Sequence, residues 1–191
     1  MKKKVIEIFE NASLVHSDFF NNSSNIDYLT QIVRIIIKAF KNDNKVLLCG
    51  NGGSAADAQH IAAELSGRFY MDRPPLFAEA LHVNTSYLTA VANDYSFDEV
   101  YSRLIISKGK KGDVLIGIST SGQSKNVYEA LVKAKELGMH TISFCGKNKT
   151  KYFDVSEICL NIPSEDTPRI QELHILIGHI ICDMIERNYI S

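Results

Sequence analysis

The segment from Val46 to Gly67 constrains the fold more than any other, because it joins a strand pattern, a glycine loop and a helix pattern. The apolar run 46–49 predicts a short buried strand, and the loop that breaks it reads GNGGS over 50–54. On the alanine-rich helix that follows, His60 and Glu64 are four residues apart and therefore share one face. A strand, a glycine loop and a helix start are typical of an anion or sugar-phosphate site. The segment thus predicts an anion site beside a pair of groups suited to metal binding or proton transfer.

Composition narrows the class of protein. The chain has 191 residues, enough for one domain with a sizeable core, and its 45% hydrophobic and 23% charged residues are typical of a globular protein. The net charge of -1, with both signs interspersed, gives no electrostatic argument for nucleic acid or a membrane surface as a partner.

Targeting signals and cysteines favour a cytoplasmic protein. The N-terminal MKKK is not followed by the apolar stretch of a signal peptide, and no apolar run is long enough to span a bilayer. The cysteines lie in apolar surroundings without a CxxC spacing, which predicts free thiols in a reducing compartment; they are Cys49, Cys145, Cys159 and Cys182.

Short apolar runs alternate with helical patterns along most of the chain. We expect strands at 46–49, 77–81, 114–118, 141–144 and 158–162, and helices at 54–66, 85–92, 97–107, 124–137 and 168–187. Helices between short apolar strands imply crossover connections and parallel pairing. The expected fold class is therefore α/β, a three-layer sandwich in which helices flank a five-stranded parallel sheet.

Residues 1–43 are expected to form an N-terminal helical segment that precedes the sheet-containing part over 44–191. The stretch from Leu29 to Phe40 has a helical period and a wide apolar face, and the turn signal Asn42-Asp43-Asn44 ends it. Because that face is wider than one small sheet requires, we expect part of it to pack on another subunit.

A second loop with phosphate-binding character follows the predicted strand at 114–118. It consists of Ser119, Thr120, Ser121, Gly122, Gln123 and Ser124, and leads into a helix pattern. In an open parallel sheet, ligands bind beyond the carboxyl ends of the strands, where this loop and loop 50–54 are both expected. Hydroxyls, backbone N–H groups and the positive end of a helix favour a phosphate. A helix cap with a turn is the alternative, although it needs only one or two hydroxyls.

Taken together, these motifs resemble the sugar isomerase (SIS) domain family. GNGGSAADAQHIAAEL at 50–65 and STSGQSKNV at 119–127 carry the resemblance, and VANDYSF at 91–97 and RIQELHILIGHIICDMIE at 169–186 extend it over nearly the whole chain. Within the family, the chain is similar to isomerases that interconvert sedoheptulose 7-phosphate and D-glycero-D-manno-heptose 7-phosphate for surface polysaccharides. The resemblance implies a flavodoxin-like SIS fold, a cytoplasmic location, and a homotetramer with 1–43 as oligomerisation segment and active sites at subunit interfaces.

The resemblance also implies one zinc ion per subunit, held at the positions of His60, Glu64, Gln171 and His179. Imidazole and carboxylate groups are zinc ligands. Gln171 and His179 are eight residues apart, roughly 12 Å along a straight helix. Contributions from different subunits, or a bent helix, would bring both to one ion. Taken alone, His60 and Glu64 could also form a solvated polar face.

Isomerisation of an aldose or ketose needs a base, an acid, and stabilisation of the charge that develops on an enediol. The resemblance implies Glu64 as the base and His179 as the acid, with zinc polarising the carbonyl or orienting hydroxyls. The expected contacts to the sugar phosphate come from both loops, the two helices and VANDYSF: Asn51, Gly52, Gly53, Ser54, Glu64, Arg68, Asn93, Asp94, Ser119, Thr120, Ser121, Gln123, Ser124 and Gln171. A plain turn residue is the alternative for Asp94, and a surface arginine for Arg68.

Other functions within the family remain to be weighed. Some relatives are non-catalytic adaptors that bind a replication-initiator protein, and others are sugar-phosphate sensors. The joint presence of His60, Glu64, Gln171 and His179 favours the enzyme, because an adaptor does not need all four. An isomerase of a different phosphosugar is disfavoured by the N-terminal helical extension and by RIQELH at 169–174.

Overall fold

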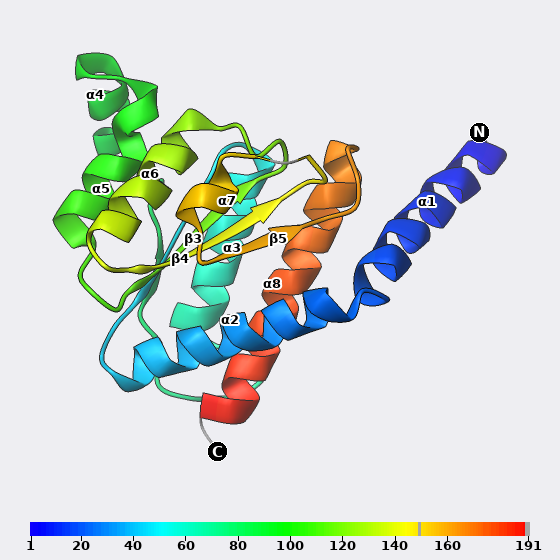
Figure 1. The fold of residues 1–191 in the computed structure, drawn as a ribbon, viewed down its shortest axis with the longest axis horizontal. Helices are drawn as coiled ribbons and strands as arrows, with labels where there is room; N and C mark the ends of the chain where they lie inside the picture. The colour runs from blue at the N-terminus through cyan, green and yellow to red at the C-terminus, as the bar shows by residue number, and fades with distance from the viewer. Residues whose placement is uncertain (149, 190–191) are drawn as a thin grey trace.

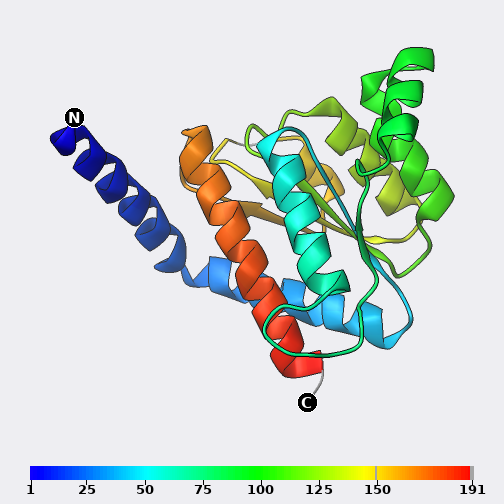
Figure 2. The same cartoon turned by 180° about the vertical axis from the view of Figure 1, so that it is seen from behind.

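Five parallel strands form the centre of the structure, and helices cover both faces of the sheet (Figures 1 and 2). The computed structural model describes residues 1–148 and 150–189. The strands lie in the order β2-β1-β3-β4-β5, and their bounds are β1 Val46–Gly50, β2 Ala78–Ala80, β3 Val114–Ser119, β4 His140–Cys145 and β5 Ile158–Asn161. Each overlaps a predicted strand, so the predicted parallel sheet is confirmed.

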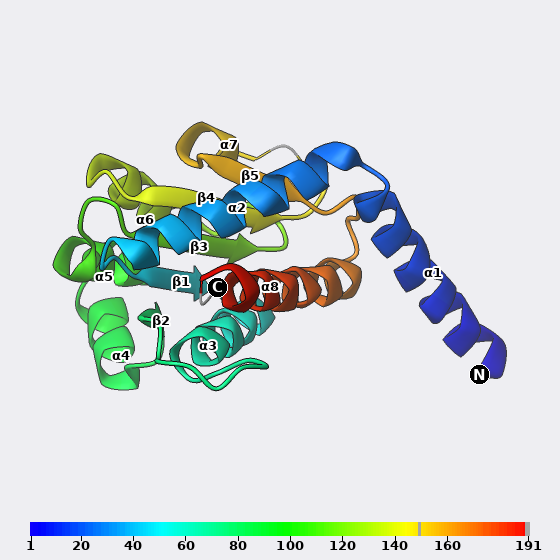
Figure 3. The ribbon, with the colours of Figure 1, turned by 90° about the horizontal axis from the view of Figure 1, so that it is seen from below.

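The helices divide between the two faces as the alternation of side chains along a strand requires. Val46 and Leu48 of β1 face a core built with α2 (Ser23–Lys41), α3 (Gly53–Ser66) and α8 (Thr167–Tyr189). Leu47 and Cys49 face a second core, built with the helices α4 (Thr85–Asp94), α5 (Val100–Lys108), α6 (Lys125–Glu136) and α7 (Tyr152–Val155). Seen from below, the sheet lies between these two sets of helices, which confirms the three-layer sandwich (Figure 3).

The helix predicted over 97–107 is divided in two. A 3-10 turn, η1 (Phe97–Glu99), begins where the hydroxyl of Ser96 accepts the N–H of Asp98 at 3.1 Å, and α5 follows it directly. The side-chain hydrogen bond tightens this first turn, since a serine hydroxyl competes with the helical pattern for backbone N–H groups.

The two N-terminal helices have different surroundings. Helix α2 belongs to the core, because Leu29, Ile32 and Ile36 are buried among residues of the sheet. Helix α1 (Lys2–Phe20) extends away from the rest of the molecule (Figure 1). Its apolar side chains are exposed over much of its length; they are Val5, Ile6, Ile8, Phe9 and Leu14. None of the helices in the described part of the chain is long and apolar enough to cross a membrane.

Asp113 joins the starts of the two central strands. Its buried carboxylate accepts hydrogen bonds from the N–H groups of Lys45 and Lys110 and from the amide of Asn44, and it pairs with the Lys45 ammonium at 2.5 Å. Burial alone would raise the pKa of Asp113, but the hydrogen bonds from Lys45, Asn44 and Lys110 outweigh burial and hold the pKa below its usual value. Since Lys45 precedes β1 and Asp113 precedes β3, the pair fixes the register of both strands.

Replacing Asp113 by Asn is expected to lower the free energy of unfolding by about 3–5 kcal/mol, because Lys45 would lose its counter-charge in a buried position. The stabilisation is present above the unfolded carboxyl pKa of about 3.9 and is lost as the pH falls through the lower folded pKa. Denaturant unfolding followed from neutral pH to pH values below the folded pKa should show the difference between the two proteins shrink towards the acid end. The control is Glu136→Gln, which removes the exposed pair with Lys133 and should leave stability almost unchanged. Equal effects of both variants would contradict this role of Asp113.

Candidate active site

The glycine loop places the start of helix α3 at the carboxyl end of β1. Gly52 has a φ of +54°, a conformation that favours glycine, and it stands directly before the helix. A Cβ at Gly50 would lie 2.6 Å from the Ser54 carbonyl oxygen, so that position also has no room for a side chain. The predicted arrangement of strand, loop and helix is confirmed, with the first N–H groups of α3 at the edge of the sheet.

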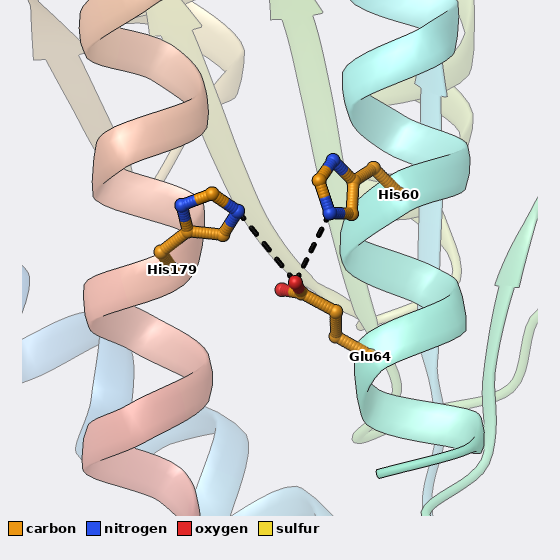
Figure 4. A group of neighbouring side chains, drawn as sticks. All are labelled: His60, Glu64 and His179. Carbon is orange, nitrogen blue, oxygen red and sulfur yellow. Dashed lines mark ion pairs between the residues drawn. The ribbon is translucent and has the colours of Figure 1, made fainter. Parts of the chain in front are cut away.

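Three chemically active side chains meet between α3 and α8. His60 and Glu64 come from α3 and His179 from α8, and Figure 4 shows both imidazole rings directed at the Glu64 carboxylate. The Nε2 atoms of His60 and His179 lie 3.0 Å and 3.6 Å from Glu64 Oε1, and the ring centroids are 5.1 Å apart. One ligand atom from each residue lies within 4.8 Å of the others. We call these three residues the His–Glu–His cluster.

Close contact between the two helices forms the cluster. Gly178, next to His179, faces Ile61 so closely that an added Cβ would lie 2.6 Å from the Ile61 side chain. The absence of a side chain at this glycine lets α8 approach α3, and with it His179 approaches Glu64. The Glu64 side chain is only 15% exposed, whereas those of His60 and His179 are 51% and 37% exposed. The cluster therefore has a largely buried carboxylate, with two imidazoles that are more exposed to solvent.

A buried ion pair lies at the C-terminal end of α3. The Glu186 carboxylate accepts the backbone N–H groups of residues 69–71 and the Nε of Arg73. The Arg73 guanidinium also donates to the carbonyl oxygens of Glu64 and Leu65, both at 2.9 Å. Burial alone would raise the pKa of Glu186, but the three backbone N–H groups and Arg73 lower it further than burial raises it. The pair thus ties α3, the segment after it and α8 together.

The serine loop has converging hydroxyls, as its sequence predicts. The Ser119 hydroxyl lies 3.1 Å from that of Ser124 and 3.4 Å from that of Ser121. Gly122 has a φ of +63° and donates its N–H to the Ser119 hydroxyl, which curls the loop. Ser124 stands directly before α6, so the hydroxyls gather at the positive end of that helix. Thr120 and Gln123 belong to the same turn.

Side chains connect the glycine loop to two neighbouring helices. Asn51 of this loop and Asn126 of α6 exchange two amide hydrogen bonds, each 2.9 Å long. The hydroxyl of Tyr101 on α5 donates to the Gly50 carbonyl oxygen. The Asn51 amide, predicted to contact the sugar, is therefore engaged with the helix that follows the serine loop.

Three predicted site residues, Gln171, Asn93 and Asp94, lie on other parts of the fold than the His–Glu–His cluster. The Gln171 amide packs against Gly53 at the start of α3, where an added Cβ would lie 2.2 Å from its Nε2. Helix α8 runs without interruption from Thr167 to Tyr189, so Gln171 stays about two turns from His179. Asn93 and Asp94 lie exposed at the end of α4 and share a hydrogen bond of 2.8 Å, and Arg68 is exposed after α3.

Two further titratable groups lie close to these helices. His174 is fully buried on α8, donates from Nε2 to the Cys145 carbonyl oxygen, and has a pKa that burial lowers to about 4. It is therefore a neutral core residue at pH 7, with its proton on Nε2, the nitrogen that donates to the carbonyl oxygen. Asp57 lies one turn before His60, and burial raises its pKa to about 6 although the nearby His60 charge opposes the shift. Its Oδ2 atom has no hydrogen-bond partner within the described part of the chain.

The comparisons with known proteins agree with this architecture. A model of the SIS domain family matches residues 10–146. A phosphoheptose isomerase from Helicobacter pylori (strain P12) is 50% identical over 185 residues, which is 96% of each chain. The structure of phosphoheptose isomerase GmhA from Neisseria gonorrhoeae superposes with a TM-score of 0.91 at 41% identity, covering 97% of this chain and 98% of that one. A phosphoheptose isomerase structure from Francisella tularensis has a TM-score of 0.93 at 33% identity with the same coverage. These matches show that the chain belongs to the SIS domain family, among the phosphoheptose isomerases.

Proposed function

We propose that this aldose–ketose isomerase converts sedoheptulose 7-phosphate to D-glycero-D-manno-heptose 7-phosphate by proton transfer at the His–Glu–His cluster. The proposal rests on one observation above all: a buried carboxylate with two imidazoles on its Oε1 atom, from two helices. The relatives named phosphoheptose isomerase, at 50% identity over nearly the whole chain, support the choice of substrate. A non-catalytic adaptor would not need this cluster.

The reaction moves one proton between neighbouring carbons and one between their oxygens. Glu64, as base, takes a proton from C1 of the ketose and returns it to C2, with an enediol between the two steps. His179, as acid, gives a proton to the O2 oxygen and takes back the proton that the O1 hydroxyl loses. Its imidazole lies beside the Glu64 carboxylate, with Nε2 3.6 Å from Oε1, so both groups reach adjacent atoms of one sugar. The proton is carried by the ring nitrogen that does not hold the metal, because a nitrogen bound to a metal ion carries no proton.

The cluster also fits a zinc ion. Its ligand atoms are two imidazole nitrogens and a carboxylate oxygen within 4.8 Å of one another, and Glu64 Oε2 is buried with no hydrogen-bond partner among residues 1–148 and 150–189. We infer one zinc per subunit on His60, Glu64 and His179. Because α8 keeps this chain's own Gln171 two turns away, the partner subunit's Gln171 is the fourth ligand in this proposal. When bound, such an ion polarises the carbonyl and orients the hydroxyls of the sugar.

The serine loop is the proposed phosphate site. Its hydroxyls gather at the N-terminus of α6, where the helix dipole and backbone N–H groups favour an anion. The remaining predicted sugar contacts come from both loops and from α4 and α8. They are Asn51, Gly52, Gly53, Ser54, Arg68, Asn93, Asp94, Thr120, Gln123 and Gln171.

A homo-oligomer, of four subunits in this proposal, would cover the exposed apolar side of α1. Phe9 and Leu14 are 70% and 60% exposed on this helix, which extends from the molecule (Figure 1). Large apolar side chains that are exposed outside the core of their own chain are typical of a subunit interface. The four unpaired thiols support a reducing cytoplasm as the location.

The first test is conversion of sedoheptulose 7-phosphate by metal-loaded and chelator-treated protein, followed by NMR of the product. Metal-loaded protein should form the aldoheptose phosphate, and chelated protein should lose activity and regain it when zinc is added. Activity that survives verified metal removal would contradict the zinc assignment but leave the isomerase. A folded, metal-loaded oligomer without turnover would contradict the proposed reaction.

Glu64→Gln is expected to reduce kcat by about two to four orders of magnitude, because the amide cannot accept the proton from C1. The change keeps the size of the side chain, so the circular dichroism spectrum should stay the same. Zinc content, measured by mass spectrometry, separates loss of the base from loss of the ion. Glu136→Gln on the exposed face of α6 is the matched control and should keep full activity. Near-normal kcat in Glu64→Gln would refute its role as base.

Ser121→Asp is expected to raise the Kd for sedoheptulose 7-phosphate at least about tenfold, a loss of about 1.4 kcal/mol, since a carboxylate would face the phosphate. Ser121→Ala should have a smaller effect, because it removes a hydroxyl without adding charge. The control Ser86→Asp adds the same charge at the exposed start of α4. Isothermal titration with the inactive Glu64→Gln protein measures binding without turnover. Equal affinities of Ser121→Asp and Ser86→Asp would contradict the proposed phosphate site.

A further inference from the structure

Phe69 stacks on the imidazole of His179. The two rings lie with centroids 5.9 Å apart and planes inclined by 24°. Phe69 belongs to the segment between α3 and β2, is half-buried, and packs against the core formed by α2, α3 and α8. The aromatic ring therefore touches the site from outside the two helices that carry its polar groups.

Phe69 is held in place through its backbone. Its N–H donates to Glu186 Oε1 at 2.8 Å, and the N–H groups of the next two residues donate to Oε2. Glu186 is seven residues after His179 on α8, which is about two turns and so the same side of the helix. Both side chains of the Arg73–Glu186 pair are 1% exposed. Hydrogen bonds to Glu186 thus hold the Phe69 backbone against α8, the helix that carries His179.

The rings around His179 restrict how its imidazole can turn. One neighbour is Phe69, nearly parallel at 24°, and another is His60, whose ring stands at 73° to that of His179. Rotation about χ2 would move Nε2 away from Glu64 and would give up the nearly parallel contact with Phe69. Stacking therefore favours the orientation in which Nε2 faces Glu64 Oε1 at 3.6 Å.

We propose that Phe69 is a positioning residue that orients the His179 imidazole for proton transfer, and that the Arg73–Glu186 pair acts on the site through Phe69. This inference rests on the proposed role of His179. Catalytic groups lose much of their effect when they are displaced by as little as 1 Å. Residues packed around a reacting imidazole therefore affect the reaction rate even where they do not touch the substrate.

The test compares Phe69→Leu with Phe69→Tyr. Leucine keeps an apolar side chain without the flat ring, and tyrosine keeps the ring. Phe69→Leu is expected to lower kcat about ten- to hundredfold, while KM changes by less than about twofold because uniform substrate binding is unaffected. Phe69→Tyr should restore most of kcat. Phe77→Leu, at an exposed phenylalanine before β2, is the matched control and should behave as wild type.

A spectroscopic measurement reports on the ring itself. The imidazole C–H resonances of His179, assigned by their loss in His179→Gln, should shift in Phe69→Leu because the ring current of Phe69 disappears. They should keep nearly their wild-type positions in Phe69→Tyr and Phe77→Leu. Thermal unfolding identifies any general loss of stability, which would not move one histidine resonance selectively.

A double-mutant cycle tests the link to the ion pair. Glu186→Gln should lower kcat in the same direction as Phe69→Leu, and the combined variant should lose little more than the larger single effect. Fully additive losses would overturn the claim that Glu186 acts through Phe69.

The outcomes separate the two levels of the proposal. Unmoved His179 resonances in Phe69→Leu would overturn the positioning role. Shifted resonances with unchanged kcat would also overturn it if His179→Gln is inactive. If His179→Gln itself keeps normal turnover, the proposed catalytic role of His179 fails, while the shifted resonances still support Phe69 as the residue that orients its ring.

Discussion

The buried pair of Arg73 and Glu186 is the interaction on which the candidate site depends most. Two opposite charges at 1% exposure stabilise a fold only if their remaining hydrogen-bonding groups are satisfied. Here the carboxylate accepts three backbone N–H groups, and the guanidinium donates to carbonyl oxygens at the end of α3. The pair supplies hydrogen-bond partners for the carbonyl groups at the end of α3 and for the N–H groups of the irregular segment after it, which have no partners in a helix or strand. Loss of either charge would leave several buried backbone groups unpaired at once, next to Glu64.

The topology separates the two loops from the His–Glu–His cluster. The glycine loop and the serine loop lie at the carboxyl ends of β1 and β3, neighbouring strands at the centre of the sheet. The His–Glu–His cluster lies further along α3, since His60 is seven residues and roughly 10 Å after Gly53. Helix α3 therefore connects the proposed anion site with the proposed site of proton transfer. This separation would suit an extended sugar phosphate, whose reacting carbons lie at the end opposite to the phosphate.

The sequence predicted the centre of the sheet well because β1 and β3 are almost continuous apolar runs, as parallel strands buried on both faces require. His60 and Glu64 could be paired from their spacing alone, since four residues make one turn of a helix. His179 entered only through the family resemblance, because no local pattern reveals that α8 lies against α3. Phe69, Arg73 and Glu186 were not predicted. Their partners are backbone groups and rings that are distant in the sequence. A charged residue that is buried in the fold also looks, in the sequence, like any charged residue on the surface.

The exchange of amide hydrogen bonds between Asn51 and Asn126 has a consequence for ligand binding. A loop that is disordered before binding loses conformational entropy when a ligand orders it, and this loss weakens the affinity. The two amide bonds and the hydrogen bond from the Tyr101 hydroxyl to Gly50 join the glycine loop to α6 and α5 during folding. The glycine loop is therefore ordered before any ligand binds, so binding there costs less conformational entropy.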